Sequence, residues 1–186
     1  MKILKLLLLL VVLGIAVAAT AIYSGIVNVA ADEPHSDLVY WLLEETRETS
    51  IKKAAQDIEV PDLADPELLL SGGVDYNFMC ASCHLKPGQK ESDMSVGLYP
   101  APPNLTIAAQ SHEGHEHGDD AQSARKNFWV IKHGIKASGM PAWGKTHDDK
   151  RIWAMVAFLR RLPELTADQY QILTALDPND NQEMDH

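Results

Sequence analysis

The two cysteines of this 186-residue chain lie within five residues, in the stretch Cys80-Ala81-Ser82-Cys83-His84. A Cys-x-x-Cys-His stretch is the attachment motif of a c-type haem. One helical turn brings both thiols to the same side, where they form thioethers with the two vinyl groups of the haem, and the adjacent imidazole comes to lie under the iron. The motif predicts a single covalent haem c on Cys80 and Cys83, with His84 as an axial ligand.

Other uses of a closely spaced cysteine pair fit this sequence less well. A thioredoxin-like redox pair needs a βαβ setting, whereas alternating strand patterns are absent here. A structural zinc site needs a further pair of Cys or His ligands at finger-like spacing, and none is evident. A disulfide between Cys80 and Cys83 would close too small a loop to stabilise the fold appreciably.

The N-terminus carries an apolar run from Leu6 to Tyr23, interrupted only by Gly14 and Thr20 and preceded by two lysines. About 18 such residues approach the length that crosses a hydrocarbon core of about 30 Å. Lysines ahead of the run keep the amino end in the cytoplasm, so we expect the rest of the chain to be exported. Residues 1–31 are therefore an uncleaved membrane anchor or, alternatively, a signal peptide cleaved after small residues.

Acidic residues outnumber basic ones, with 26 Asp and Glu against 16 Lys and Arg and a net charge of −10. This balance argues against a nucleic-acid partner, because phosphate neutralisation needs surplus cations. The acidity is concentrated in residues 32–75, with 12 acidic and 3 basic side chains. We expect residues 32–65 to be an acidic helical linker segment. Its extra amphipathic helix would begin near Ser36 or Asp37, and the sequence does not choose between the domain, the membrane surface and a partner as its docking site.

Helical patterns continue through residues 66–165, the expected haem domain. Asp65 followed by Pro66 is a typical N-cap and first helical position. Apolar residues at helical spacing and a stop before Pro163 define the last helix. The expected helices lie at about 66–79, 123–133 and 148–162, and residues 166–186 are expected to form a polar C-terminal tail. The fold class is all-α, with three to four helices around one haem.

Met140 is the expected second axial ligand of the iron. Gly139 permits a close approach of the chain and Pro141 fixes the adjoining backbone, which suits a rigid ligand loop. Met140 follows His84 by 56 residues, far enough for the chain to reach the other haem face. The competing ligands are Met94, His133 and His147.

From about Pro66 to Leu162 the chain resembles a class I c-type monohaem cytochrome of the bacterial, membrane-anchored kind. In that family a helix with a glycine and an aromatic residue before the haem motif crosses the C-terminal helix. Gly72 and Tyr76 match this pattern, and Met155 with Phe158 supplies the opposing face.

The resemblance also implies further haem contacts. The family has a Pro-x-Leu after the haem motif, whose proline carbonyl accepts the proton of the proximal imidazole and so fixes its ring. Pro103-Asn104-Leu105 fits that pattern. Trp129 and Trp143 resemble the aromatic residues that wall the haem pocket in relatives.

A haem iron with both axial positions filled by protein is suited to one-electron transfer, and a methionine ligand raises its potential. We therefore expect an electron carrier, not an enzyme, that serves redox partner proteins. The alternative is a haem-based sensor or ligand-binding protein in which Met140 is displaced. We expect a single-pass protein of the bacterial inner membrane with a periplasmic haem domain, or a soluble periplasmic protein if the leader is cleaved. Five lysines are expected around the docking edge: Lys86, Lys90, Lys132, Lys136 and Lys145.

One further stretch has ligand-like composition. Residues 112–120 gather His112, His115 and His117 with four carboxylates. Imidazole and carboxylate groups bind copper, zinc or nickel. The stretch is either a solvated surface loop or a weak metal site.

Overall fold

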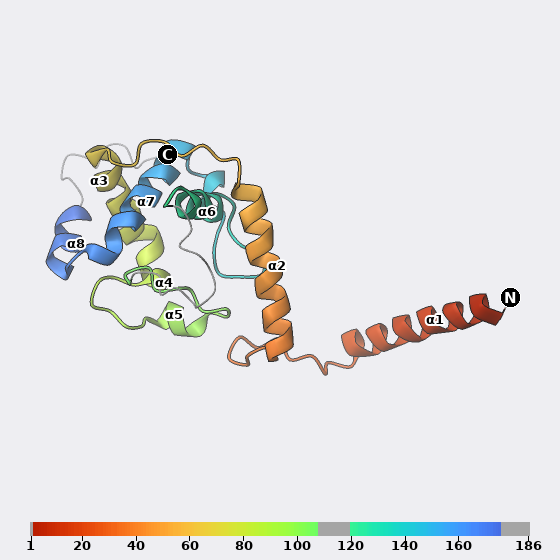
Figure 1. Ribbon diagram of the computed structural model, residues 1–186. Coiled ribbons are helices and arrows are strands. Elements are labelled where there is room, and N and C mark those ends of the chain that lie inside the picture. Colours follow the sequence, from red (N-terminus) through yellow and green to blue (C-terminus); the bar gives the residue numbers. More distant parts are fainter. Residues whose placement is uncertain (1, 108–119, 176–186) are drawn as a thin grey trace. The chain divides into compact units, whose positions relative to one another are not determined.

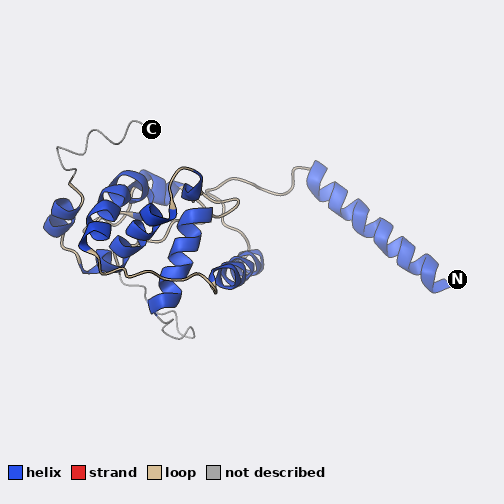
Figure 2. Cartoon of the chain, turned by 90° about the horizontal axis from the view of Figure 1, so that it is seen from above, coloured by secondary structure: helices blue, strands red, loops and turns tan. Residues whose placement is uncertain are grey.

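The computed structural model describes residues 2–107 and 120–175, and within these residues all regular structure is helical (Figure 2). The predicted all-α fold class is confirmed. The chain divides into two compact units, Met1–Pro34 and His35–His186. All of the His-rich stretch except Asp120 lies outside the described residues, so the predicted weak metal site at His112, His115 and His117 is not described.

The first unit consists largely of helix α1, Lys2–Tyr23, in which no residue is buried. Among the described residues α1 is the one helix long and apolar enough to cross a membrane, as judged by length and composition. This agrees with the apolar run seen in the sequence.

The second unit is built on the crossing of α3, Pro66–Asp75, with α7, Asp149–Arg161 (Figure 1). Both helices begin as predicted, because the side chain of Asp65 accepts a hydrogen bond from the Glu67 amide and that of Asp148 accepts one from Arg151. At the crossing, Gly72 is buried against the backbone of α7. A Cβ atom on Gly72 would lie 1.9 Å from the Ala154 carbonyl oxygen, so only glycine fits there.

An ion pair also joins α3 to α7. The buried carboxylate of Asp75 accepts two hydrogen bonds of 2.7 Å from the guanidinium of Arg151. Paired bonds of this kind have a defined geometry as well as a charge attraction. They link the end of α3, five residues before Cys80, to the start of α7.

Helix α6, Asp120–His133, completes the main core and ends at Gly134, which has a φ of +64°. The interior of this core is apolar and aromatic. Phe128 of α6 stacks on Trp153 of α7 with ring centroids 4.1 Å apart. The remaining buried members of this cluster are Leu63, Ala124, Ile131, Ile152, Met155, Val156 and Ala157.

Helix α2, Asp37–Ala55, is the extra helix expected before the haem domain, and it packs on α6. Its C-terminal half carries the contact, since Ile51 and Ala55 are buried. Glu48 pairs with Lys126 of α6. Residues after α2 also follow α6, because the Arg125 side chain donates a 2.9 Å hydrogen bond to the Ile58 carbonyl.

The sequence-based prediction places the start of the C-terminal tail too early, at residue 166. Ala167–Leu173 form helix α8, with Thr166 and Gln169 in a reciprocal capping box. Tyr170 of α8 is buried and its ring lies 6.2 Å from that of Tyr76 and 6.1 Å from that of Phe158. The buried Tyr170 ring therefore packs this largely polar segment on the core. The average polarity of the segment did not predict this contact.

The shorter elements connect these helices. They are η1 (Tyr76–Cys80), α4 (Ala81–His84), α5 (Asp93–Gly97), η2 (Trp143–Lys145) and η3 (Leu162–Glu164).

Candidate haem site

The two cysteines lie where the helical backbone changes its winding. Continuing α3, residues Tyr76–Cys80 form one turn of π-helix, and the Ala81 amide donates to the Tyr76 carbonyl. α4 then carries Ser82, Cys83 and His84. Single π-turns inside helices are frequent at functional sites. The sequence predicted a continuous α-helix to about Met79, and nothing in it signals the wider turn.

Both thiols are free in the structure. Burial, together with the nearby charges of Asp75 and Cys83, raises the pKa of Cys80 to about 12. A cysteine of this kind is a neutral thiol at physiological pH, whereas redox-active cysteines have lowered pKa values. Within the described residues, no group of three or more His, Cys, Asp or Glu side chains is placed to hold a metal ion. The raised pKa of Cys80 argues against the thioredoxin-like alternative.

The His84 imidazole is oriented from outside the motif. Its Nδ1 atom lies 2.8 Å from the Pro103 carbonyl oxygen, the contact that the family resemblance implies. Burial lowers the pKa of His84, and the hydrogen bond to Pro103 only partly offsets this effect. The imidazole is therefore neutral at physiological pH, with Nδ1 engaged and Nε2 left to bind a metal.

The backbone of His84 is held from the opposite side. The buried hydroxyl of Tyr76 donates to the Leu85 carbonyl at 2.7 Å and lies 3.1 Å from the His84 carbonyl. The Leu105 amide also donates to the His84 carbonyl, at 3.3 Å. Leu85 has a φ of +72° although it is not glycine, so the chain turns sharply directly after His84. Neither this left-handed residue nor the role of the Tyr76 hydroxyl was predicted.

Met140 lies in a loop whose backbone is fixed by its own hydrogen bonds. The Ser138 hydroxyl accepts from the Met140 amide at 3.1 Å, and the Ile135 amide donates to the Met140 carbonyl at 3.1 Å. Gly134 allows this turn, because a Cβ there would lie 2.7 Å from the Met140 carbonyl oxygen. The Met140 side chain is half-buried and packs against the main core.

The remaining candidate side chains lie in pairs. The Trp129 ring lies 4.9 Å from that of His133, and the Trp143 ring lies 5.5 Å from that of His147. His133 ends α6 and is exposed, as expected of a helix-end residue. Met94 lies in α5 and is 48% exposed.

The donor set suits a haem. A porphyrin is a broad apolar plate that needs two thiols, neutral axial ligands and surrounding apolar side chains. Cys80, Cys83, His84, Met140, Trp129 and Trp143 are each half-buried. Of these, Cys80, Met140 and Trp143 pack against the buried core. Two thiols, a neutral imidazole and a thioether are the ligand types that c-type cytochromes use.

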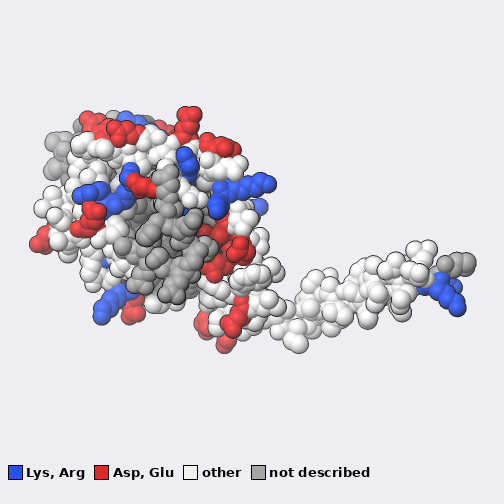
Figure 3. All heavy atoms as spheres, viewed as in Figure 1, with Lys and Arg blue, Asp and Glu red and all other residues white. Residues whose placement is uncertain are grey.

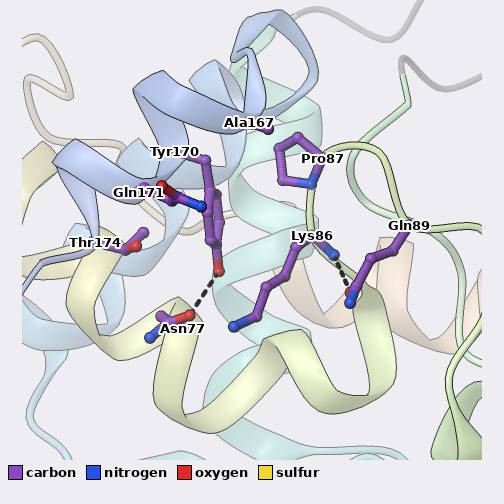
Figure 4. Close-up of a pocket in the computed structure, with 8 residues that line it drawn as sticks. All are labelled: Asn77, Lys86, Pro87, Gln89, Ala167, Tyr170, Gln171 and Thr174. Carbon is purple, nitrogen blue, oxygen red and sulfur yellow. Dashed lines mark hydrogen bonds between the residues drawn. The ribbon is translucent and has the colours of Figure 1, made fainter.

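A separate pocket of about 470 Å³ lies between α8 and the turn after His84 (Figure 4). Its lining is mostly amide, hydroxyl and ammonium side chains, together with two apolar ones, Pro87 and Ala167. The polar members are Asn77, Lys86, Gln89, Tyr170, Gln171 and Thr174. The Tyr170 hydroxyl donates to the Asn77 side chain at 3.1 Å, and the Lys86 ammonium lies 6.0 Å from the Tyr170 ring centroid. None of the predicted haem contacts lines this pocket.

Comparison with known protein families supports the interpretation of these residues as a haem site. A family model described as "Cytochrome C oxidase, cbb3-type, subunit III" matches residues 67–159, which is half of the chain. The matched residues include the cysteine motif, Pro103 and Met140. No curated protein and no solved structure matches the chain.

A cytochrome c domain is typically an electron carrier rather than an enzyme, and Cys80 and Cys83 within it imply covalent haem c. The α3–α7 crossing at Gly72 and the contact between His84 and Pro103 are the features that the sequence resemblance implied. The chain thus belongs to the family of cbb3-type cytochrome c oxidase subunit III, a class I c-type cytochrome domain.

Proposed function

We propose that this protein carries one electron at a time on a haem c bound to Cys80 and Cys83, with His84 and Met140 as the axial ligands. The observation that supports this proposal is that each of the two expected axial ligands is held in place by hydrogen bonds. Pro103 orients the imidazole of His84, and the loop hydrogen bonds of Ser138 fix the backbone of Met140. When bound, the haem supplies a metal that alternates between ferric and ferrous states.

The chain's own residues would keep the structural change that accompanies this change of oxidation state small. His84 is held through its ring by Pro103 and through its backbone by Tyr76. Met140 contributes a neutral, polarisable sulfur, which favours the ferrous state. Rigid ligands of this kind need little rearrangement when an electron arrives or leaves, which suits a carrier.

The proposal extends to the placement of the protein. α1 would anchor the chain in the bacterial inner membrane with the haem domain in the periplasm, and the cleaved alternative would release it there. The partners would be donor and acceptor redox proteins. Figure 3 shows basic and acidic side chains mixed on one face of the molecule. Lys132, one of the five lysines expected at the docking edge, pairs with Asp149 at 2.6 Å.

The test is the spectrum of the full chain, produced in cells that attach haem c and purified in detergent. The wild type should gain the mass of one haem and show a low-spin spectrum, with the ferric charge-transfer band of a methionine ligand. Met140→Ala should keep the covalent haem but lose that band and become high-spin or take another ligand. Met94→Ala is the matched control and should leave the spectrum unchanged.

Three results would contradict the proposal. A wild-type spectrum that is five-coordinate and shifts on addition of carbon monoxide would instead support the sensor. An unaltered spectrum in Met140→Ala would reject Met140 as the ligand. A chain without covalent haem would reject the function as a whole.

A further inference from the structure

Helix α2 is fixed to the haem domain at both of its ends, although it lies outside the residues that the family model matches. Ile51 and Ala55 bury its C-terminal half on α6. At the other end, the His35 amide donates a 3.0 Å hydrogen bond to the Tyr99 hydroxyl, and the two rings lie 5.2 Å apart. α2 is therefore a part of this domain and not a free linker.

The segment that holds the N-terminal end of α2 also adjoins both candidate axial ligands. Tyr99 is four residues before Pro103, whose carbonyl contacts the His84 ring. The neighbouring Leu98 packs against Gly139, where a Cβ atom would lie 2.9 Å from a Leu98 methyl group. Gly139 directly precedes Met140. One short stretch, residues 98–103, thus connects the two ligand-bearing loops with α2.

After Asp37, the first two turns of α2 consist of six consecutive apolar or aromatic residues that are uncovered within the described residues. The residues are Leu38, Val39, Tyr40, Trp41, Leu42 and Leu43, and each is at least 40% exposed. A helix that is apolar all round is usually buried. The Tyr40 hydroxyl has no hydrogen-bond partner among the described residues. Some apolar group is therefore expected to cover at least part of this surface.

Helix geometry identifies which side of α2 faces the domain. Tyr40 precedes the buried Ile51 by 11 residues, or about three turns, so the two lie within about 20° on the helix. Leu42 precedes Ile51 by nine residues and lies about 180° away. Tyr40 is thus on the side that packs on the domain, yet 40% of it is exposed, whereas Leu42 is on the opposite side and is 56% exposed.

We infer that the Tyr40 side of α2 lies against the haem and forms a wall of its pocket that the family-matched residues do not supply. The inference rests on the proposed function, since it requires the haem on Cys80 and Cys83. The porphyrin is the large apolar group expected beside residues 98–103, and it would cover the side of α2 that the described residues leave bare. By excluding water from that part of the haem, α2 would confine electron exchange to other edges.

Two substitutions in α2, each of which introduces a carboxylate, test the inference in the full, detergent-solubilised holoprotein. Tyr40→Glu and Leu42→Glu add the same charge to the same helix on opposite sides. A carboxylate close to the iron stabilises the ferric form, so Tyr40→Glu should lower the ferrous-to-ferric ratio at a fixed ambient potential by at least about fivefold. Leu42→Glu, facing solvent, should change that ratio by less than about twofold.

A second measurement does not depend on a variant that perturbs folding. In wild-type protein with isotope-labelled tyrosine and leucine, the Tyr40 ring signals should shift between the oxidised and reduced states far more than the Leu42 methyl signals. Equal responses at the two positions, in either experiment, would overturn the inference that α2 forms a wall of the haem pocket. The haem spectrum would still support the proposed electron-carrier function. A colourless wild-type protein would instead overturn the proposed function and this inference with it.

Discussion

Gly72→Ala should open the crossing of α3 and α7, and its cost follows from the distances at that point. The added Cβ would lie 1.9 Å from the Ala154 carbonyl oxygen and 2.4 Å from its carbon. Carbon and oxygen atoms settle at about 3.3 Å, so the helices must separate by about 1.4 Å. Both clashing atoms belong to backbone, which has no rotamer to relieve the contact.

The net free energy is the balance of two effects. Overpacking a tight core costs up to about 3 kcal/mol, and replacing a helical glycine by alanine recovers about 1 kcal/mol of helix propensity. We expect a net loss of about 2 kcal/mol in the free energy of unfolding. For a unit of this size that corresponds to a fall in Tm of about 4–8 °C.

The assay is thermal unfolding of the holoprotein in detergent, followed by helical circular dichroism. Gly97→Ala is the matched control, because Gly97 also lies in a helix and a Cβ there meets nothing within 4 Å. The control should be neutral or slightly stabilised. A Gly72→Ala protein whose Tm equals that of Gly97→Ala would refute the close-crossing argument.

Two further predictions concern single contacts. Tyr76→Phe removes the buried donor to the Leu85 carbonyl and should cost about 1–2 kcal/mol of unfolding free energy in denaturant titrations. Tyr170→Phe, with a half-buried hydroxyl, should cost less, and equal losses would contradict the assigned roles. The second prediction concerns pH. Burial raises the pKa of Glu48, but Lys126 and Arg47 more than offset this, so the pKa is lowered overall. This carboxylate therefore stabilises the docking of α2 above its ordinary pKa, and the effect is lost as the pH falls below about 4.5. The contribution is below about 1 kcal/mol because the pair is partly exposed. The protection factors of α2 amides, which correct for the pH dependence of intrinsic exchange, should fall over that range in the wild type and not in Glu48→Gln.

Local sequence patterns predicted the parts of the fold that depend on near neighbours. The Asp65 and Asp148 caps depend on amides two or three residues away, so both helix starts were predicted correctly. The apolar stripe of α7 and its stop before Pro163 were equally local. These elements carry the crossing on which the haem domain is built.

The features that were missed depend on distant parts of the chain. The polar average of residues 166–173 hid one buried ring, Tyr170, whose partners lie in α3's continuation and in α7. The docking side of α2 depends on its contact with α6, in which Glu48 pairs with Lys126, 78 residues later in the chain. The left-handed conformation of Leu85 could not be predicted, since such a conformation is usually marked by a glycine. Here the hydrogen bond from the Tyr76 hydroxyl stabilises the turn instead.

The Tyr76 contacts also connect the helix crossing with the expected haem ligand. The Tyr76 ring packs 5.4 Å from that of Phe158 in α7, while its hydroxyl holds the backbone that follows His84. Separating α3 from α7 must therefore shift the anchor of His84, whereas the Pro103 contact on the other side stays in place. The backbone next to His84 would then move relative to Pro103, so the orientation of the His84 imidazole would change. Gly72→Ala should consequently alter the Soret circular dichroism of the folded holoprotein well below its Tm, and Gly97→Ala should not. An unaltered Soret signal in a destabilised Gly72→Ala protein would show that the crossing supports the fold without positioning the ligand.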